Sequence, residues 1–379
     1  MQGYEVLEAT DGEIAWELIK KSGVSFVVSD WVMPNLAGIE LCRRIRASDL
    51  ERYIYVILCT SKGAQSDLIE GMDAGADDFL VKPISPEEFR VKVRAGERVL
   101  DLQQRLADKN RELFGINERL ESAHKLIEDD LKAASWMQQN LLPPPTLKAH
   151  GAKCEWRLLP AGYVAGDIFN FFPLDDRHIA FYLLDVSGHG VPAAMLSVSL
   201  SMMLTADAAA GSPLKRYDNS KGKFEVCSPD ETVQELNRRF QSTDGRYFTM
   251  IYGLFDKASS SLRIAQAGHP PPILIKRGGG LETLGTGGMP IGLWPEIEFD
   301  SFEVKIAQGD KLLLYSDGIT ECMNVRGESL GEERLLQYVA RARDLPLDEL
   351  LDSLLDFVKE WHGSAEIADD MSLLAIEMN

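Results

Sequence analysis

The stretch 97–142 limits the possible folds of this chain more than any other, because apolar side chains recur in it every seven residues. It contains one glycine, Gly115, and no proline. The main apolar row comprises Val99, Leu106, Leu113, Leu120, Ile127, Ala134 and Leu141. The second row, three residues further on, comprises Leu102, Ile116, Ala123 and Met137, and it is interrupted by Lys109 and Asp130. A repeat sustained over this length predicts a coiled coil that pairs two subunits.

The alternative for this stretch is one long helix packed on a neighbouring domain, since apolar stripes are often part of a core. The run 143–145 is Pro-Pro-Pro and ends the helix, because proline lacks the helical N–H and clashes with the preceding turn. The 379 residues correspond to about two to three domains. We therefore expect a domain at 1–96, a helical coiled-coil linker at 97–145 and another domain at 146–379.

The first of these parts alternates short β-branched runs with amphipathic stretches. The predicted strands are Glu5–Ala9, Ser25–Ser29, Ile54–Cys59 and Asp77–Val81. The predicted helices are Gly12–Lys20, Ala37–Arg46, Ala64–Asp73 and Pro86–Ala95. This alternation predicts an α/β domain with βα units on a parallel sheet.

The last part has a different pattern, in which glycine-rich turns separate many short apolar runs. The predicted strands are Ile179–Leu184, Met250–Phe255, Leu262–Ala267, Ile273–Lys276, Lys311–Tyr315 and Ser372–Glu377. The predicted helices are Val191–Ala208, Pro229–Ser242, Glu332–Ala342 and Leu347–Trp361. This pattern predicts an α+β domain on a largely antiparallel sheet. Residues 211–228 are predicted to form an exposed loop.

The charge balance excludes several kinds of partner. Lys and Arg number 40 and Asp and Glu number 59, which gives a net charge of −19. A chain this acidic binds DNA or an anionic membrane poorly, so we expect no nucleic-acid partner and no membrane partner. No apolar run approaches the ~20 residues of a spanning helix, and residues 1–4 show no feature of a secretory signal. The five cysteines are scattered, which predicts free thiols in a cytoplasmic protein.

Three short segments follow one another in a specific order in the first part: Ser29–Pro34, Cys59–Ser61 and Gly75–Pro83. Together they resemble a two-component response-regulator receiver. The resemblance implies that Asp30 accepts a phosphoryl group, and that a sensor histidine kinase acts upstream. It also implies phosphoryl contacts from Thr60 and Lys82, and an aromatic switch at Phe79. This assignment fits the chemistry, because an aspartate can attack an activated phosphoryl donor while a lysine supplies a point charge.

The sequence departs from the receiver pattern at its beginning. The family starts with a strand and an acidic pair that holds Mg²⁺, whereas this sequence starts at the second strand. In the sheet order 2-1-3-4-5 the first strand lies between strands 2 and 3. Either the sequence is shortened, or its start is misplaced, or this receiver is not phosphorylated in the ordinary way. We expect acetyl phosphate to leave Asp30 unlabelled in the chain as given.

Four aspartate-bearing motifs occur in the last part: Ala165–Asn170, Leu184–Gly190, Tyr315–Glu321 and Ala368–Ser372. Three of them adjoin a predicted strand, where their side chains can converge. Converging carboxylates persist only if some are protonated or if cations lie between them. No cluster of His and Cys accompanies them, so the oxygen ligands predict a hard cation such as Mg²⁺, Mn²⁺ or Ca²⁺. Two such ions can activate a water and clamp a phosphoryl group, which predicts hydrolysis of a phosphate ester.

The order of the four motifs is more specific than any one of them. With Phe248–Met250 and Ala267–Pro270 between them, they resemble the PPM family of metal-dependent serine/threonine phosphatases, specifically the bacterial SpoIIE type. The resemblance covers about residues 150–379. It implies a β-sandwich flanked by helices and a centre with two Mn²⁺ or Mg²⁺ ions.

The resemblance also assigns ligand roles to individual residues. It implies that Asp185 bridges the two ions and that the backbone carbonyl of Val186 is the next ligand. Asp317 and Asp369 would complete the first metal site. Asp167 would hold metal-bound waters at the second. These four aspartates are therefore the expected catalytic residues.

Several further residues are expected to lie near the metal centre or to support its structure. Asp370 would lie beside the second metal site. Asn170 stands where the family often has Asp, which predicts a weaker second site or an outer-sphere role. His189 is expected to have a scaffolding or hydrogen-bonding role, and His269 a structural one. Trp294 could line a substrate rim, but we expect it to be a core residue.

The complete architecture is multidomain and resembles bacterial partner-switching regulators. The resemblance implies that the substrate is a phosphorylated STAS-domain anti-sigma-factor antagonist. Loss of its phosphate would remove about two negative charges and change its choice of partner. The linker, as a homodimer, would pass the receiver's state to the phosphatase through its coil register. The competing interpretation is a catalytically weak docking module that sequesters a partner protein.

Overall fold

The structure is a computed structural model that describes residues 3–61, 65–149, 151–207, 211–241, 245–363 and 367–378. Three ends of predicted helices, at Ala64, Ala208 and Ser242, lie outside the described residues. The chain forms two compact units, Met1–His124 and Lys125–Asn379. No helix in the described parts of the chain is both long enough and apolar enough to cross a bilayer.

The first unit is a parallel three-stranded sheet with helices, as predicted. The strands are in the order β1 (Phe26–Asp30), β2 (Tyr55–Thr60) and β3 (Asp78–Val81). Its helices are α1 (Gly12–Lys21), α2 (Gly38–Arg46), α3 (Gln65–Asp73) and the beginning of α4 (Pro86–Gln139). β2 is buried along its whole length because it is the central strand of the sheet.

The predicted strand Glu5–Ala9 is wrong, because these residues form no strand and are exposed. A strand needs a neighbour for its backbone N–H and C=O groups. β1 lies at the sheet edge and pairs only with β2 among the described strands. Glu5–Ala9 pairs with no strand among the described residues.

Helix α4 is one continuous helix from Pro86 to Gln139, where the sequence predicted a separate helix at Pro86–Ala95 and a linker helix after it. Gly96 does not interrupt it. A Cβ atom at Gly96 would lie 2.4 Å from the ring of Phe26 and 2.6 Å from the ring of Tyr55. Gly96 is therefore explained by close packing of the helix on β1 and β2. The predicted long linker helix is confirmed.

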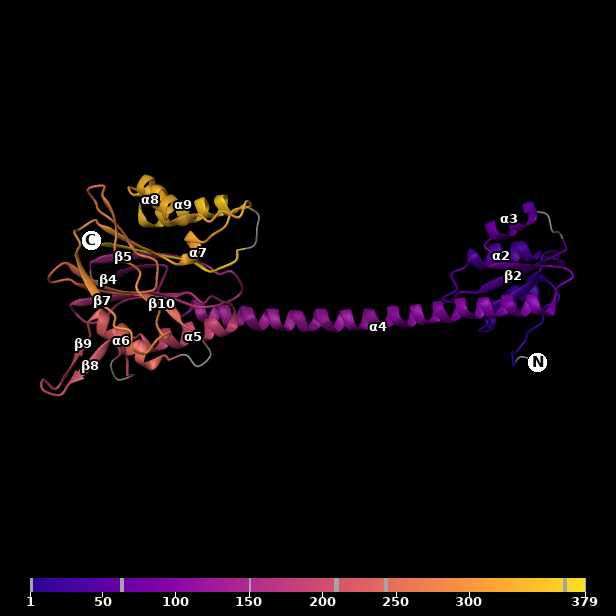
Figure 1. Ribbon diagram of the computed structural model, residues 1–379, viewed down its shortest axis with the longest axis horizontal. Coiled ribbons are helices and arrows are strands. Elements are labelled where there is room, and N and C mark those ends of the chain that lie inside the picture. Colours follow the sequence, from indigo (N-terminus) through magenta and orange to yellow (C-terminus); the bar gives the residue numbers. More distant parts are fainter. Residues whose placement is uncertain are drawn as a thin grey trace. The chain divides into compact units, whose positions relative to one another are not determined.

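The second unit is a sandwich of two antiparallel sheets, as predicted (Figure 1). The first sheet, in the order β14-β11-β10-β7-β6, comprises β6 (Ile168–Pro173), β7 (His178–Val186), β10 (Phe248–Asp256), β11 (Ser261–Ala267) and β14 (Ser301–Lys305). The second sheet, in the order β13-β12-β15-β16-β5-β4, comprises β4 (Thr146–Ala149), β5 (Ala152–Leu159), β12 (Ile273–Ile275), β13 (Leu281–Thr283), β15 (Lys311–Tyr315) and β16 (Met371–Met378).

Helices cover the outer faces of both sheets (Figure 1). The first sheet is covered by α5 (Val191–Met203) and α6 (Pro229–Arg239). The second sheet is covered by α8 (Gly331–Ala342) and α9 (Leu347–His362), and the short helix α7 (Asp317–Thr320) precedes them. Because both faces are covered, β7 is buried at almost every position, and its sequence is a nearly unbroken apolar run.

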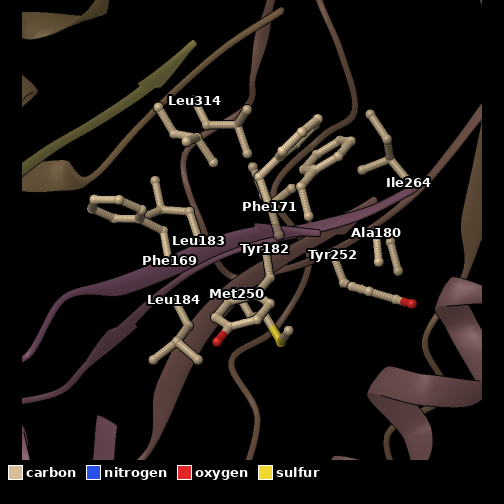
Figure 2. Packing of buried hydrophobic residues seen from close by; sticks show 14 of the residues in the cluster. Phe169, Phe171, Ala180, Tyr182, Leu183, Leu184, Met250, Tyr252, Ile264 and Leu314 are labelled. Carbon is tan, nitrogen blue, oxygen red and sulfur yellow. The ribbon is translucent and has the colours of Figure 1, made fainter. Parts of the chain in front are cut away.

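The core between the sheets is built from alternating positions. Figure 2 shows Leu314 of β15 facing Phe169 and Leu183 of the first sheet, while Tyr182 and Leu184 point to the opposite face. Successive side chains of a strand point to opposite faces. Asp185 therefore lies on the same face as Leu183, toward the second sheet.

Residues 211–228 were predicted to be an exposed loop, and this is wrong for the parts that form strands. They contain the two-stranded hairpin β8 (Lys215–Asp218) and β9 (Lys223–Val226). The rings of Tyr217 and Phe224 pack edge to face across it, with centroids 5.1 Å apart, and both remain half exposed. This cross-strand aromatic pair stabilises the hairpin. The two strands are short and polar, so the sequence pattern does not predict them.

Candidate metal centre

Two of the predicted site residues lie at one edge of the first sheet. Asp167 immediately precedes β6, and Asp185 is the penultimate residue of β7. The two strands are antiparallel neighbours in which Ile168 pairs with Leu184, so the start of β6 and the end of β7 meet. A Cβ atom at Gly166 would lie 3.1 Å from the carbonyl oxygen of Val186. This close approach brings the loop before β6 alongside the end of β7.

Two more aspartates lie where β15 ends and β16 begins in the second sheet. Asp317 is the first residue of α7, directly after β15 and Ser316. The Ser316 hydroxyl donates to the carbonyl oxygen of Asp370 at 3.1 Å and accepts from the Ser372 N–H at 2.9 Å. A Cβ atom at Gly318 would lie only 2.1 Å from the carbonyl oxygen of Asp370. The segments that carry Asp317 and Asp370 are therefore fastened together.

Asp370 also joins the second sheet to the first. Its carboxylate accepts hydrogen bonds from the backbone N–H of Ala161 at 2.7 Å and from that of Gly166 at 2.6 Å. Gly166 directly precedes Asp167. The ends of the two sheets therefore meet, and they carry the predicted aspartates toward one region.

Asp167 is the most unusual of these carboxylates. It is 1% exposed, and neither of its oxygens has a hydrogen-bond partner among the described residues. Burial raises its pKa well above the ordinary value of 3.8, and the charge of Asp185 adds to that shift. A buried carboxylate without a partner costs several kcal/mol when it is ionised. A cation bound beside Asp167 would favour its ionised form, and the released proton would pass to solvent.

The neighbouring carboxylates raise one another's pKa values. Burial, followed by the charges of Asp317 and Asp369, raises the pKa of Asp185 to about 8. Burial and then Asp369 and Glu321 raise the pKa of Asp317 to about 6. No Lys or Arg among the described residues forms an ion pair with Asp185, Asp317 or Asp369. The cluster is therefore short of positive charge.

The donor chemistry fits a divalent cation, since every nearby donor is an oxygen and such donors select hard ions. The arrangement of the side chains fits a cation less well than their chemistry does. In the described part of the chain, no group of three or more His, Cys, Asp or Glu side chains is arranged to hold one ion.

Three further features of the site were not assigned from the sequence. Glu321 raises the pKa values of Asp185 and Asp317, although it stood unassigned within the motif Tyr315–Glu321. Thr249 pairs with Asp185 across β10 and β7. Thr249 also shares a 2.7 Å hydrogen bond with His269. Glu321 lies in the motif Tyr315–Glu321, and Thr249 lies in the segment Phe248–Met250. Only the sheet register shows that Thr249 lies opposite Asp185.

The remaining predicted residues lie around this cluster. Asn170 is inside β6, opposite Tyr182, and its Oδ1 accepts the N–H of Phe171 at 2.8 Å. His189 is exposed, between two glycines with φ of +90° and +79°. Burial lowers the pKa of His269 to about 3, so its imidazole is neutral. Trp294 is 50% exposed, so its expected place in the core is wrong.

The predicted receiver residues lie at the carboxyl ends of the parallel strands in the first unit. Lys82 Nζ lies 2.8 Å from Asp30 Oδ1. That hydrogen bond raises the pKa of Lys82. Thr60 is buried at the end of β2, and the Phe79 ring in β3 has Lys92 Nζ 5.1 Å from its centroid. A Cβ atom at Gly38 would lie 2.0 Å from the carbonyl oxygen of Asp30, so the start of α2 needs glycine.

The fold and the site define a class: a receiver-like α/β unit joined through a long helix to a phosphatase-type β-sandwich. The family model for the response regulator receiver domain matches residues 1–94. The model described as Stage II sporulation protein E (SpoIIE) matches residues 175–379, more than half of the chain. The chain therefore belongs to the SpoIIE family.

Individual relatives support each part. Phosphoserine phosphatase RsbP of Bacillus subtilis is 23% identical over 251 residues, which cover 66% of this chain and 58% of RsbP. Protein IcfG of Synechocystis is 27% identical and covers 66% of this chain and 42% of IcfG. The phosphate regulon transcriptional regulatory protein PhoB of Pseudomonas aeruginosa is 38% identical over 95 residues, 25% of this chain and 42% of PhoB. The chain thus spans about two to three fifths of the length of these curated relatives.

A solved structure supports the fold of the second unit. The SiaA-PP2C domain of Pseudomonas aeruginosa superimposes with a TM-score of 0.56 at 22% identity, covering 68% of this chain and 99% of that domain. The likeness shows the shared PP2C-type architecture of two sheets with helices on their outer faces.

Proposed function

We propose that this chain is a metal-dependent protein serine/threonine phosphatase regulated by its receiver-like domain. The observation that carries the proposal is the set of acidic side chains gathered from two sheet ends, to which no Lys or Arg of the described segments is paired. The buried, unpartnered carboxylate of Asp167 supports it directly. Membership of the SpoIIE family supports the same chemistry.

The proposed ligands of two Mn²⁺ or Mg²⁺ ions are Asp185, the backbone carbonyl of Val186, Asp317, Asp369 and, through water, Asp167. When bound by these residues, the ions would supply an activated water and positive charge for the phosphoryl group. The protein's own contribution is to gather and desolvate the carboxylates. The hydrogen bonds that Asp370 accepts from Ala161 and Gly166 hold the loop that carries Asp167 in place.

The proposed substrate is a phosphoserine or phosphothreonine on a STAS-domain anti-sigma-factor antagonist. The relative RsbP is a phosphoserine phosphatase, which supports the residue type. We infer that a sensor histidine kinase acts on the receiver-like domain and that the chain is a homodimer through α4. Exposed side chains of the main heptad row support the dimer: Leu106, Leu113, Leu120 and Ile127.

The test is hydrolysis of p-nitrophenyl phosphate by the full chain after EDTA treatment, with and without added Mn²⁺. Turnover that requires Mn²⁺ and falls at least 100-fold in Asp185→Asn is the expected result. Asp344→Asn is the matched control, because its side chain is 88% exposed and outside the cluster. Turnover that does not depend on metal, or that survives in Asp185→Asn, would contradict the proposal.

A docking module that sequesters a partner is the second candidate. The observation in its favour is that no three described acidic, histidine or cysteine side chains are arranged to hold one ion. Absence of turnover at every Mn²⁺ concentration, together with stable capture of an unphosphorylated STAS-domain protein, would favour this function. Phosphoproteomics of proteins retained by Asp185→Asn, compared with wild type, identifies the substrate if the phosphatase function holds.

A further inference from the structure

Close packing and hydrogen bonds hold the backbone around His269. His269 follows Gly268, whose φ is +70° and whose Cβ, if present, would lie 2.7 Å from Pro290. The carbonyl oxygen of His269 accepts from Gln266 Nε2 at 2.6 Å. The same Gln266 side chain accepts the N–H of Gly287 at 2.8 Å. The imidazole therefore projects from a tightly held turn, so its position is determined.

The imidazole lies between the two sheets at the level of the acidic cluster. It is 1% exposed, and its Nδ1 shares a hydrogen bond of 2.7 Å with the hydroxyl of Thr249. Thr249 is the direct partner of Asp185 in the register of β10 and β7. Its Nε2 is buried and has no hydrogen-bond partner among the described residues. The ring is thus joined through Thr249 to the strand pair that carries Asp185.

We propose that His269 is a positioning residue for the metal centre, which acts through Thr249 to hold in place the end of β10 and, with it, the paired end of β7 that carries Asp185. The inference rests on the proposed metal-dependent function. It goes beyond that function by giving a role to a side chain that is not itself a ligand.

Physical chemistry favours this role over simple packing. A neutral, hydrogen-bonding ring can hold this strand end without adding a positive charge that would compete with a cation. A leucine or phenylalanine would fill a similar volume but leave the Thr249 hydroxyl without its partner. Partners bonded directly to a metal ligand typically change metal affinity about 10- to 100-fold. Thr249 adjoins Asp185 through the strand pairing, so we expect an effect at the lower end of that range.

The experiment measures Mn²⁺ binding to the full, EDTA-stripped chain by isothermal titration calorimetry, a readout that does not depend on turnover. Thr249→Val removes the hydroxyl at nearly constant volume, and Thr249→Ser keeps it. His269→Leu removes both ring nitrogens. The double variant His269→Leu with Thr249→Val tests whether the two residues act as one unit.

We expect Thr249→Val and His269→Leu each to raise the Kd for Mn²⁺ about tenfold. The double variant is expected to match the single variants, and Thr249→Ser to stay within about twofold of wild type. The inference is overturned if Thr249→Val binds Mn²⁺ as tightly as Thr249→Ser. If His269→Leu does not fold, as judged by circular dichroism, the two Thr249 variants still decide the matter.

Tyr252→Phe is the matched control, since Tyr252 is a buried hydroxyl on the same strand, three residues further along. Its Kd for Mn²⁺ is expected to equal that of wild type. An equal loss of affinity in this control would overturn the positioning role, because the effect would then belong to the strand in general. A wild-type chain that binds no Mn²⁺ overturns the proposed function itself, whereas equal binding by wild type and all variants overturns only this inference.

Discussion

The carboxylate of Asp370 accepts a hydrogen bond from the backbone N–H of Gly166 at 2.6 Å, across the junction of the two sheets. Its other oxygen accepts the N–H of Ala161 at 2.7 Å. Asp370 therefore organises the loop before β6, and through that loop it fixes where Asp167 lies. The sequence predicts Asp370 beside the second metal site. The structure adds that its carboxylate holds the loop before β6.

Asp370→Ala is expected to destabilise the second unit. The substitution leaves two backbone N–H groups without their acceptor, and an unsatisfied buried donor costs about 1–3 kcal/mol. Because removal of a buried carboxylate also relieves some repulsion, we expect the free energy of unfolding to fall by about 1–3 kcal/mol in total. Urea denaturation of the EDTA-treated chain measures this. Asp344→Ala, at an exposed position, is expected to shift it by less than about 0.5 kcal/mol.

The metal-free protein is expected to lose stability as pH rises from 5 to 8. Burial and the charges of Asp317 and Asp369 raise the folded pKa of Asp185 from 3.8 to about 8. Between these two values the folded state binds more protons than the unfolded state, so the free energy of unfolding falls as pH increases. We expect a loss of about 2–4 kcal/mol, less than the full shift implies because the carboxylates titrate together. Urea denaturation in EDTA at several pH values measures it.

Two comparisons make this pH dependence specific. Asp185→Asn cannot ionise, so its stability is expected to change less between pH 5 and 8 than that of wild type. Added Mn²⁺ is expected to flatten the wild-type profile, because a cation favours the ionised carboxylates. Wild-type stability that is constant or that increases over this range in EDTA would show that Asp185 is not held protonated by its neighbours.

Gly318→Ala is expected to damage the same junction by a steric route. The added Cβ would lie 2.1 Å from the carbonyl oxygen of Asp370, and a backbone atom cannot move aside as a flexible side chain can. We expect a loss of about 1–3 kcal/mol in unfolding free energy and weaker Mn²⁺ activation. Gly162→Ala is the control, since its Cβ would meet no atom within 4 Å. If both variants unfold at the same urea concentration as wild type, the contact is not tight in solution.

The strands that the sequence revealed are those with a dense apolar run. Ile179–Leu184 and Met250–Phe255 were predicted, and the structure extends each by one to two residues at either end. β5 (Ala152–Leu159) was missed because it has no dense apolar run, although its polar and apolar residues alternate as in a half-buried strand. Its partner β16 is more than 200 residues away. Pairing over such a distance depends on the whole fold, which a local pattern does not contain.

The site shows the same division between local and long-range information. The order of the motifs identified Asp185 and Asp317 as candidates, because each follows a recognisable strand. The facing of Thr249 and Asp185 follows only from the register of β10 and β7. The proposed role of His269 depends both on the motifs and on this register. The sequence alone therefore predicted only a structural role for His269.

Helix α4 is expected to pair with α4 of a second copy through its heptad rows. Leu113 and Leu120 are 62% and 65% exposed in the single chain, an unfavourable state for two leucines on one helical face. Leu113→Glu combined with Leu120→Glu keeps the helix propensity but places charges in the seam, so sedimentation velocity is expected to show a monomer where wild type is a dimer. Gln104→Glu with Arg111→Gln makes the same net charge change outside both rows and is expected to leave the dimer intact. A monomeric wild type, or equal dissociation of both double variants, would show that the rows do not form the interface.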